Sequence, residues 1–128
     1  MRSGRSASAM DARHAAYRLR YQRFMSSPRW RARRHKWLRE YVRRFGTAPV
    51  CACCRRGWTL RDDLHHLSYD RLGNERHEDL LPMCRTCHRA LHRILDTSPH
   101  WRAMPRSTAS LAIIERLDVH AQPNHSLW

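Results

Sequence analysis

Residues 51–92 read CACCRRGWTLRDDLHHLSYDRLGNERHEDLLPMCRTCHRALH and are rich in side chains that bind metal ions. All five cysteines of the chain lie in this stretch, and four of them form two Cys-x-x-Cys pairs: Cys51, Cys54, Cys84 and Cys87. Four of its histidines also form two pairs: His65, His66, His88 and His92. So short a stretch rarely gathers so many potential ligands by accident. We therefore expect the rest of the chain to fold around it.

The two Cys-x-x-Cys pairs predict one structural zinc ion held by four thiolates. A pair on a tight turn binds an ion from one side, and two such turns complete a tetrahedron. Zinc suits sulfur ligands and needs no redox partner. Residues 55–83 separate the pairs by more than the about 15–20 residues of a bare zinc ribbon, so further structure lies between them. Cys53 is the spare cysteine by spacing, and free or redox-active cysteines are the alternative interpretation.

The composition indicates a small basic protein with a polyanionic partner. The chain has 128 residues and a formal net charge of +14, which fits one domain with a modest core. Lys36 is the only lysine, so arginine carries nearly all of the positive charge. Arginine binds phosphate oxygens in pairs and reaches guanine edges, which favours a nucleic acid as the partner. An anionic membrane surface is the rival, because a basic amphipathic helix in the N-terminal third could lie on it.

We expect no secretory or membrane signal at the start of this sequence. Residues 1–26 lack the apolar segment of a signal peptide, and no run approaches the about 20 apolar residues of a membrane span. Their Arg- and Ser-rich composition is typical of an organellar transit peptide and of a solvated basic arm, and we favour the arm. We therefore expect a soluble protein with no membrane partner in a reducing compartment, where paired cysteines bind metal more often than each other.

Two basic helices are predicted before the first cysteine. Residues 1–26 form a basic, partly disordered arm, with disorder over residues 1–10 and a short helix over residues 11–25. The helix over residues 28–45 has signals at both ends, namely Ser27 as N-cap, Pro28 at the first position and Gly46 as C-cap. Its apolar stripe comprises Trp30, Trp37, Leu38, Tyr41, Val42 and Phe45. The arginines around this stripe exceed what solubility needs, so phosphate contacts are also expected.

The remaining sequence predicts a small α+β fold. Residues 64–69 alternate as a strand, and Gly73-Asn74 marks a turn after it. A helix follows over residues 84–95. Residues 97–128 are expected to form a linker and a C-terminal extension with a final helix over residues 107–117, without an assigned function. Three further histidines are interpreted as surface residues: His77, His100 and His120.

The spacing of the histidines suggests a second metal site. His88 and His92 lie four residues apart on the predicted helix and project from one face. Neighbouring strand residues point to opposite sides, so one of His65 and His66 can join them while the other serves a different task. In a basic protein, such a site suggests hydrolysis of phosphodiesters. That reaction needs a base to activate water and a divalent ion to stabilise the phosphate.

Taken together, these motifs resemble the HNH (His-Asn-His, ββα-metal) endonucleases in their zinc-bearing branch. The resemblance is carried, in chain order, by Cys51-x-x-Cys54, Leu64-His65-His66-Leu67, Gly73-Asn74-Glu75, Glu78-Asp79-Leu80 and Cys84-x-x-Cys87-His88-x-x-x-His92. The helix start Ser27-Pro28-x-Trp30 is also similar to the segment that many such proteins carry before the first cysteine. The combination is specific, whereas each piece alone is not.

The resemblance implies a ββα-metal (His-Me finger, treble-clef-like) module that is stapled by the four-cysteine zinc and preceded by basic helices. The nuclease domain would span residues 27–96, with the finger over residues 51–95. His66 would be the general base that deprotonates the attacking water. The catalytic divalent ion would have three ligands: His65, His88 and His92. In this family the ion is Mg²⁺ or Mn²⁺, with Ni²⁺ or Zn²⁺ accepted by histidine-rich members, and cleavage leaves 5′-phosphate and 3′-hydroxyl ends.

One position departs from the family pattern. The middle Asn of the motif normally pins the loop between strand and helix through side-chain hydrogen bonds, and Asp79 occupies its place here by spacing. An ionised Asp accepts hydrogen bonds but cannot donate them. We expect Asn74 to supply the donor from the turn.

Two classes of function follow from these observations. The leading hypothesis is a metal-dependent endonuclease that nicks or cuts duplex DNA as a monomer or weak homodimer, in the cytoplasm of a bacterium or encoded by a phage. The alternative is a catalytically inactive, zinc-stapled module that binds nucleic acid and does not need His66. A zinc scaffold for protein contacts would explain neither the charge nor the paired histidines. Four arginines are near enough in sequence to grip phosphates: Arg71, Arg76, Arg85 and Arg89.

Overall fold

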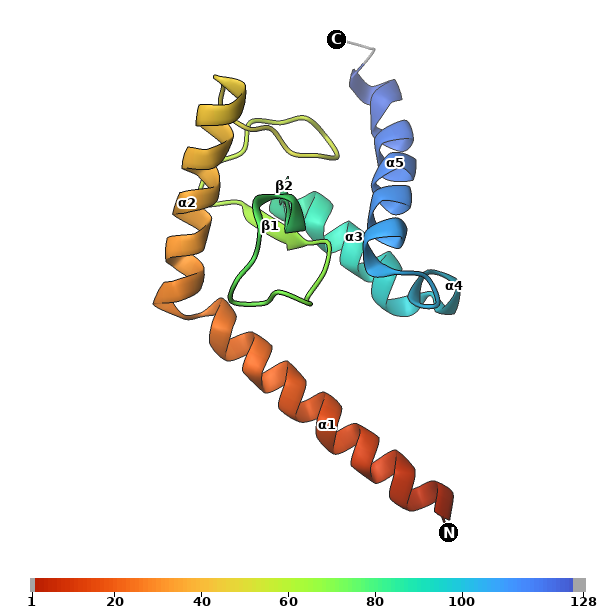
Figure 1. The fold of residues 1–128 in the computed structure, drawn as a ribbon. Coiled ribbons are helices and arrows are strands. Elements are labelled where there is room, and N and C mark those ends of the chain that lie inside the picture. The colour runs from red at the N-terminus through yellow and green to blue at the C-terminus, as the bar shows by residue number, and fades with distance from the viewer. Residues whose placement is uncertain (1, 126–128) are drawn as a thin grey trace.

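The computed structural model describes residues 2–125, and its side chains are described at residue 12 and residues 15–117. Within this range, five α-helices and a short 3-10 helix accompany a two-stranded antiparallel sheet, which lies between α2 and the α3–α5 region (Figure 1). The small α+β fold expected from the sequence is therefore present. No helix in the described part is long and apolar enough to cross a membrane.

Helix α2 (Pro28–Phe45) begins and ends at the residues that the sequence predicts. Ser27 is extended, and its hydroxyl accepts a hydrogen bond from the Trp30 N–H at 3.3 Å, which satisfies one of the unpaired donors of the first turn. Pro28 occupies the first helical position, where no N–H is needed. Gly46 is left-handed with φ 72°, and its N–H bonds to the Val42 carbonyl at 2.8 Å.

Helix α1 (Arg2–Met25) projects away from the rest of the molecule (Figure 1). It begins earlier than expected, so the predicted disorder of residues 1–10 is wrong for residues 2–10, and residue 1 lies outside the described part. Ala, Arg and Met favour a helix, and extending a formed helix is easier than nucleating one. The C-terminal half of α1 is anchored, because Tyr17 and Tyr21 both make ring contacts with Tyr69.

One hydrophobic cluster, the tryptophan core, joins α2 to the sheet. It comprises Trp30, Trp37, Trp58, Leu64 and Leu80. The predicted stripe of α2 is buried only in part, since Val42 and Phe45 are 45% and 56% exposed. The cluster ends at Tyr41, whose ring lies 5.4 Å from that of Trp37, and the last turn of α2 extends beyond it.

The sheet consists of β1 (Asp63–His66) and β2 (Leu80–Met83), with Asp63 opposite Met83 and His66 opposite Leu80. Strand β1 is shorter than the predicted 64–69, because the chain turns away after His66. The predicted turn is present, and Gly73 adopts φ 92°, a conformation that side chains with a Cβ rarely adopt. The 3-10 helix η1 (His77–Asp79) returns the chain to β2.

Three helices follow the sheet: α3 (Arg85–Thr97), α4 (Pro99–Arg102) and α5 (Arg106–His125). Within residues 97–125, the part of this segment that the structure describes, α4 lies inside the predicted linker and α5 extends beyond the predicted 107–117 at both ends. Helix α5 packs against α3 and completes a second cluster, the α5 core. It comprises Cys51, Cys53, Met83, Leu91, Leu95, Trp101, Ala109, Ile113 and Ile114.

The Ile113→Ala variant should test whether α5 belongs to the folded core. Ile113 is 1% exposed, so the substitution removes buried methyl groups and should lower the free energy of unfolding by about 2–5 kcal/mol. Leu111 on the same helix is 51% exposed, and Leu111→Ala should change it by less than about 0.5 kcal/mol. Urea unfolding at a fixed zinc concentration measures both. Equal midpoints for the two variants would contradict this packing of α5.

Candidate metal centres and active site

The four predicted zinc ligands come together from two parts of the chain. The sulfur atoms of Cys51, Cys54, Cys84 and Cys87 all lie within 4.8 Å of one another. Cys51 and Cys54 belong to the turn before Trp58, whereas Cys84 caps the N-terminus of α3 and Cys87 lies in its first turn. The Ala52 N–H donates to the Pro82 carbonyl at 2.7 Å, which fixes the first turn against β2.

The donor set fits a tetrahedral zinc ion. With Zn–S bonds of about 2.3 Å, ligand sulfurs lie about 3.8 Å apart, and the Cys54 and Cys84 sulfurs are 3.8 Å apart. A disulfide would need about 2.05 Å. Burial raises the pKa of Cys51, but hydrogen bonds from the backbone of Cys84, Cys54 and Cys53 outweigh this and bring that pKa below its usual value. The spare cysteine, Cys53, is buried in the α5 core outside this group, as its spacing predicted.

A second convergent group consists of His65, His88 and His92. Strand β1 turns His65 toward α3, and the spacing of four residues puts His88 and His92 on the facing side of that helix. His65 Nδ1 lies 3.2 Å from His88 Nε2, which lies 3.0 Å from His92 Nε2. Nitrogen ligands of one ion at about 2.1 Å are about 3.0 Å apart in octahedral and about 3.4 Å apart in tetrahedral geometry. The three rings therefore have the spacing of one divalent cation site.

The outer nitrogens of the three rings are also held. His88 Nδ1 lies 3.0 Å from Asp63 Oδ2, and His92 Nδ1 lies 3.4 Å from Asp96 Oδ2. A carboxylate only accepts, so these outer nitrogens carry the protons and the inner Nε2 atoms present lone pairs. His65 Nε2 lies 2.9 Å from the hydroxyl of Ser110. Such outer partners are what orients histidine ligands toward a metal.

Burial also keeps these histidines in the form that binds a metal. Burial is the main cause that lowers the pKa of His65 to about 2, and it also brings the pKa of His92 below its ordinary value. Both rings are therefore neutral near pH 7, and only neutral imidazole coordinates metal. The hydrogen bond from His88 lowers the pKa of Asp63, which stays a carboxylate.

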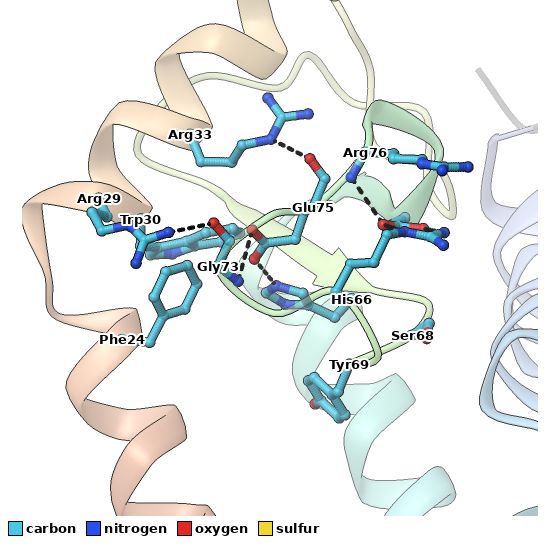
Figure 2. A network of polar contacts seen from close by, with 12 residues as sticks. Phe24, Arg29, Trp30, Arg33, His66, Ser68, Tyr69, Gly73, Glu75 and Arg76 are labelled. Atoms are coloured by element: carbon cyan, nitrogen blue, oxygen red, sulfur yellow. Dashed lines mark hydrogen bonds and ion pairs between the residues drawn. The ribbon is translucent and has the colours of Figure 1, made fainter.

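The neighbouring histidine, His66, lies on the other side of β1, as strand alternation predicts. Its Nε2 is 2.8 Å from Glu75 Oε2, and both side chains are 1% exposed (Figure 2). Trp30 stacks on the ring at 4.8 Å, and Tyr69 and Tyr21 cover it further. The Glu75 carboxylate accepts at Nε2, so the proton lies there and Nδ1 is the basic nitrogen of His66.

The loop that carries Glu75 is bound to α2 through backbone carbonyls. Arg29 donates to the Gly73 carbonyl at 2.8 Å and Arg33 to the Glu75 carbonyl at 2.9 Å, as Figure 2 shows. Arg34 donates in the same way to the carbonyls of Leu60 and Asp62. These three arginines of α2 therefore hold the fold together, and the expectation that the arginine excess of α2 serves phosphates does not extend to them.

Asp79 holds the loop between β1 and η1 through hydrogen bonds that its carboxylate accepts. Arg71 binds both carboxylate oxygens at 2.8 and 2.5 Å, and the Arg76 N–H adds a third bond at 2.9 Å. The bond from Arg71 is the main cause that lowers the pKa of Asp79. Asn74 lies in the turn, where its backbone N–H bonds to the Arg71 carbonyl at 2.7 Å.

Of the four arginines near enough in sequence to bind phosphates, Arg71 is bonded to Asp79, whereas Arg76, Arg85 and Arg89 have exposed side chains. The interpretation of His77 as a surface residue is wrong. Its side chain is 12% exposed, lies parallel to Trp37 at 5.0 Å and bonds to Glu40. His100 is exposed as expected, and the side chain of His120 lies outside the described part.

Four residues of the site were not assigned from the sequence: Asp63, Glu75, Asp96 and Ser110. Asp96 had a local signal, because it lies four residues after His92 on the same helix. Ser110 had none, since its contact with His65 joins residues far apart in the chain.

The chain was compared with protein-family models, curated proteins and solved structures. No protein-family model matches the chain, and no curated protein or solved structure matches it either.

Removal of zinc should unfold the domain, because sites of this kind contribute on the order of 10 kcal/mol to folding. Cys84→Ser should purify without tightly held zinc, whereas Cys53→Ser should retain it, since Cys53 lies outside the sulfur group. Metal analysis gives the zinc content, and circular dichroism with and without chelator reports the fold. Zinc lost equally from both variants would rule out this ligand set.

Ser110→Ala should weaken metal binding at the histidine group by about 10- to 100-fold, because the outer partner of a histidine ligand orients the ring. The measurement is calorimetric titration of Ni²⁺ into protein already loaded with one zinc per chain. Ser107→Ala on the exposed face of the same helix is the matched control and should titrate like the parent protein. Unchanged Ni²⁺ affinity of Ser110→Ala would show that the Ser110 contact does not support the site.

Proposed function

We propose that this protein is a metal-dependent endonuclease of the HNH kind, which hydrolyses phosphodiester bonds in DNA. The observation that carries the proposal is the convergence of three histidine nitrogens beside a buried His–Glu pair on consecutive residues of one strand. His65 belongs to the first group and His66 to the second. The hairpin β1–β2 followed by α3 also supports it, since this order of elements is the one that the resemblance implies.

The proposed chemistry assigns a separate task to each side of β1. A divalent ion held by His65, His88 and His92 would supply charge stabilisation at the scissile phosphate. On the other side, Nδ1 of His66 accepts the proton of the attacking water, whose oxygen bonds to phosphorus as the bond from phosphorus to the 3′ oxygen breaks. The leaving oxygen takes its proton from solvent. Glu75 keeps the proton of the neutral ring on Nε2 and stabilises the imidazolium that forms, as the carboxylate does in other His–carboxylate pairs.

The charge distribution supports a nucleic acid as the substrate. The formal net charge is +14, and exposed arginines lie along α1 and α3. They include Arg18, Arg20, Arg23, Arg85, Arg89 and Arg93. Arginines on two helices that flank the histidine groups can bind phosphates on both sides of a cleaved bond. Such binding should weaken steeply with added salt, because counterions are released from the nucleic acid.

A second candidate is a zinc-stapled nucleic-acid-binding module without catalysis. The observation that favours it is the burial of His66, which is 2% exposed beneath Trp30, Tyr21 and Tyr69. A general base must reach the proton that it abstracts, directly or through one water. Under the first proposal, substrate binding therefore has to open this cover.

The two candidates differ in supercoiled-plasmid cleavage by zinc-loaded protein, with and without Mg²⁺, Mn²⁺ or Ni²⁺. The nuclease proposal expects metal-dependent nicking. His66→Ala should slow it by about 10²- to 10⁴-fold, the usual contribution of a positioned base, with plasmid binding retained. Glu75→Gln should also slow nicking. The amide of Gln can donate a hydrogen bond to Nε2, which moves the proton of the neutral ring to Nδ1 and removes the basic nitrogen there. His35→Ala, an exposed position on α2, is the control and should cut normally.

Folded protein that shifts the plasmid without nicking it in any of the three metals would instead support the binding module. Nicking that His66→Ala leaves unchanged would keep the nuclease but remove His66 as its base.

A further inference from the structure

Two adjoining clefts lie between α1 and the loop that follows β1. One has a volume of about 370 Å³ and the other of about 290 Å³. Tyr17 and Tyr69 line both clefts, so this pair of rings forms the wall between them. The larger cleft reaches His92, which connects it to the histidine group, and the smaller one continues to Leu72 on the far side of the wall.

The walls of these clefts offer aromatic rings in an arrangement that suits stacking. Tyr17 meets Tyr69 edge to face at 6.2 Å, and Tyr21 meets Tyr69 in the same way at 5.3 Å. Tyr17 is the exposed ring of the three, at 39%, so a base can reach it. Nucleic acid bases stack on tyrosine without regard to sequence, because every base has a π-face.

Each cleft also contains an arginine. The larger one is lined by Arg18 and Arg106, and the smaller one by Arg20. Arg106 lies over the ring of Tyr69 at 4.2 Å and donates to the Tyr69 hydroxyl at 2.7 Å and to the His66 carbonyl at 2.8 Å. Asp96 is the acidic residue that lines the larger cleft, and its carboxylate is paired with His92.

The tyrosines themselves add no negative charge. Burial raises the pKa of Tyr17, Tyr21 and Tyr69 above the ordinary value of a phenol, so the hydroxyls stay neutral at physiological pH. A phosphate that passes these rings therefore meets hydroxyl donors and guanidinium groups, which are the partners of a polyanion.

From these observations we propose that the two clefts bind two consecutive unpaired nucleotides of a nucleic acid strand, whose backbone leads to the histidine group. Each cleft has about the volume of a site for one small ligand. Bases that are paired and stacked inside a duplex do not present their faces to a side chain, so stacking on these rings requires unpaired nucleotides. Alternating aromatic and arginine contacts are the pattern of single-strand binding grooves. The proposal rests on the proposed nuclease function and refines it, since it names an unpaired strand as the part of the substrate nearest the metal.

Binding rather than cleavage tests this proposal. The probe is a short fluorescein-labelled oligothymidylate, titrated with zinc-loaded protein and followed by fluorescence anisotropy, with the integrity of the probe checked on a gel. Tyr17→Ala should weaken binding by about fivefold or more, the loss expected for one stacked base, whereas Tyr17→Phe should bind like the parent protein. Leu19→Ala is the matched control, because Leu19 is 48% exposed on the same helix and lines neither cleft.

A second pair of variants tests the charge. Arg18→Ala removes an arginine that lines the larger cleft, and Arg23→Ala removes one from the same helix outside both clefts. Both lower the net charge equally, so a greater loss of oligothymidylate binding in Arg18→Ala reports the cleft and not the general attraction. If the two variants lose the same amount of oligothymidylate affinity, the assignment of the strand's backbone to the larger cleft is overturned.

The outcome for the clefts is separable from that for the nuclease. Plasmid nicking by the parent protein, together with oligothymidylate binding that does not depend on Tyr17, would overturn the cleft proposal and keep the nuclease. Oligothymidylate binding that depends on Tyr17, without plasmid nicking, would keep the cleft proposal and overturn the nuclease. Tyr17→Ala is also titrated with a blunt duplex of the same length. If its binding to the duplex weakens as much as its binding to the single strand, the assignment to unpaired nucleotides is overturned.

Discussion

Four cysteine sulfurs within 4.8 Å of one another form the constraint on which the rest of the structure depends. Thiolates at this distance repel each other unless a cation lies between them, so the group and the fold around it form together. The sulfurs tie the turn before Trp58 to the junction of β2 and α3. The bond from the Ala52 N–H to the Pro82 carbonyl holds this turn against β2, which pairs with β1. A slip of one residue would exchange the faces of His65 and His66.

That register divides the protein into two halves with one strand between them. The α5 core lies on the side of His65, and the tryptophan core lies on the side of His66, where Trp30 stacks on its ring. Each histidine is oriented by a partner from its own half, Ser110 in one and Glu75 in the other. The two halves meet at Arg106, which starts α5 and bonds to the His66 carbonyl. A change of packing in either core should therefore alter the orientation of the adjacent histidine ring.

The features that the sequence predicted well are those set by local spacing. The cysteine pairs, the caps of α2 at Ser27 and Gly46, and the two histidines one helical turn apart on α3 all follow from short-range geometry. The contacts that were missed join distant segments. Neither the contact of Ser110 with His65 nor the arginines of α2 bound to the Gly73–Glu75 loop leaves a pattern in the sequence. Asp79 shows both limits, since its position in the loop was predictable and its partner Arg71 was not.

The lateness of Arg106 and Ser110 in the chain has a consequence for synthesis on the ribosome. All the cysteines and the histidines of both groups precede residue 106, so they leave the ribosome before α5 does. His65 and His66 gain their contacts from α5 only afterwards. Order of translation thus separates the time at which the four sulfurs can gather from the time at which the histidines are aligned.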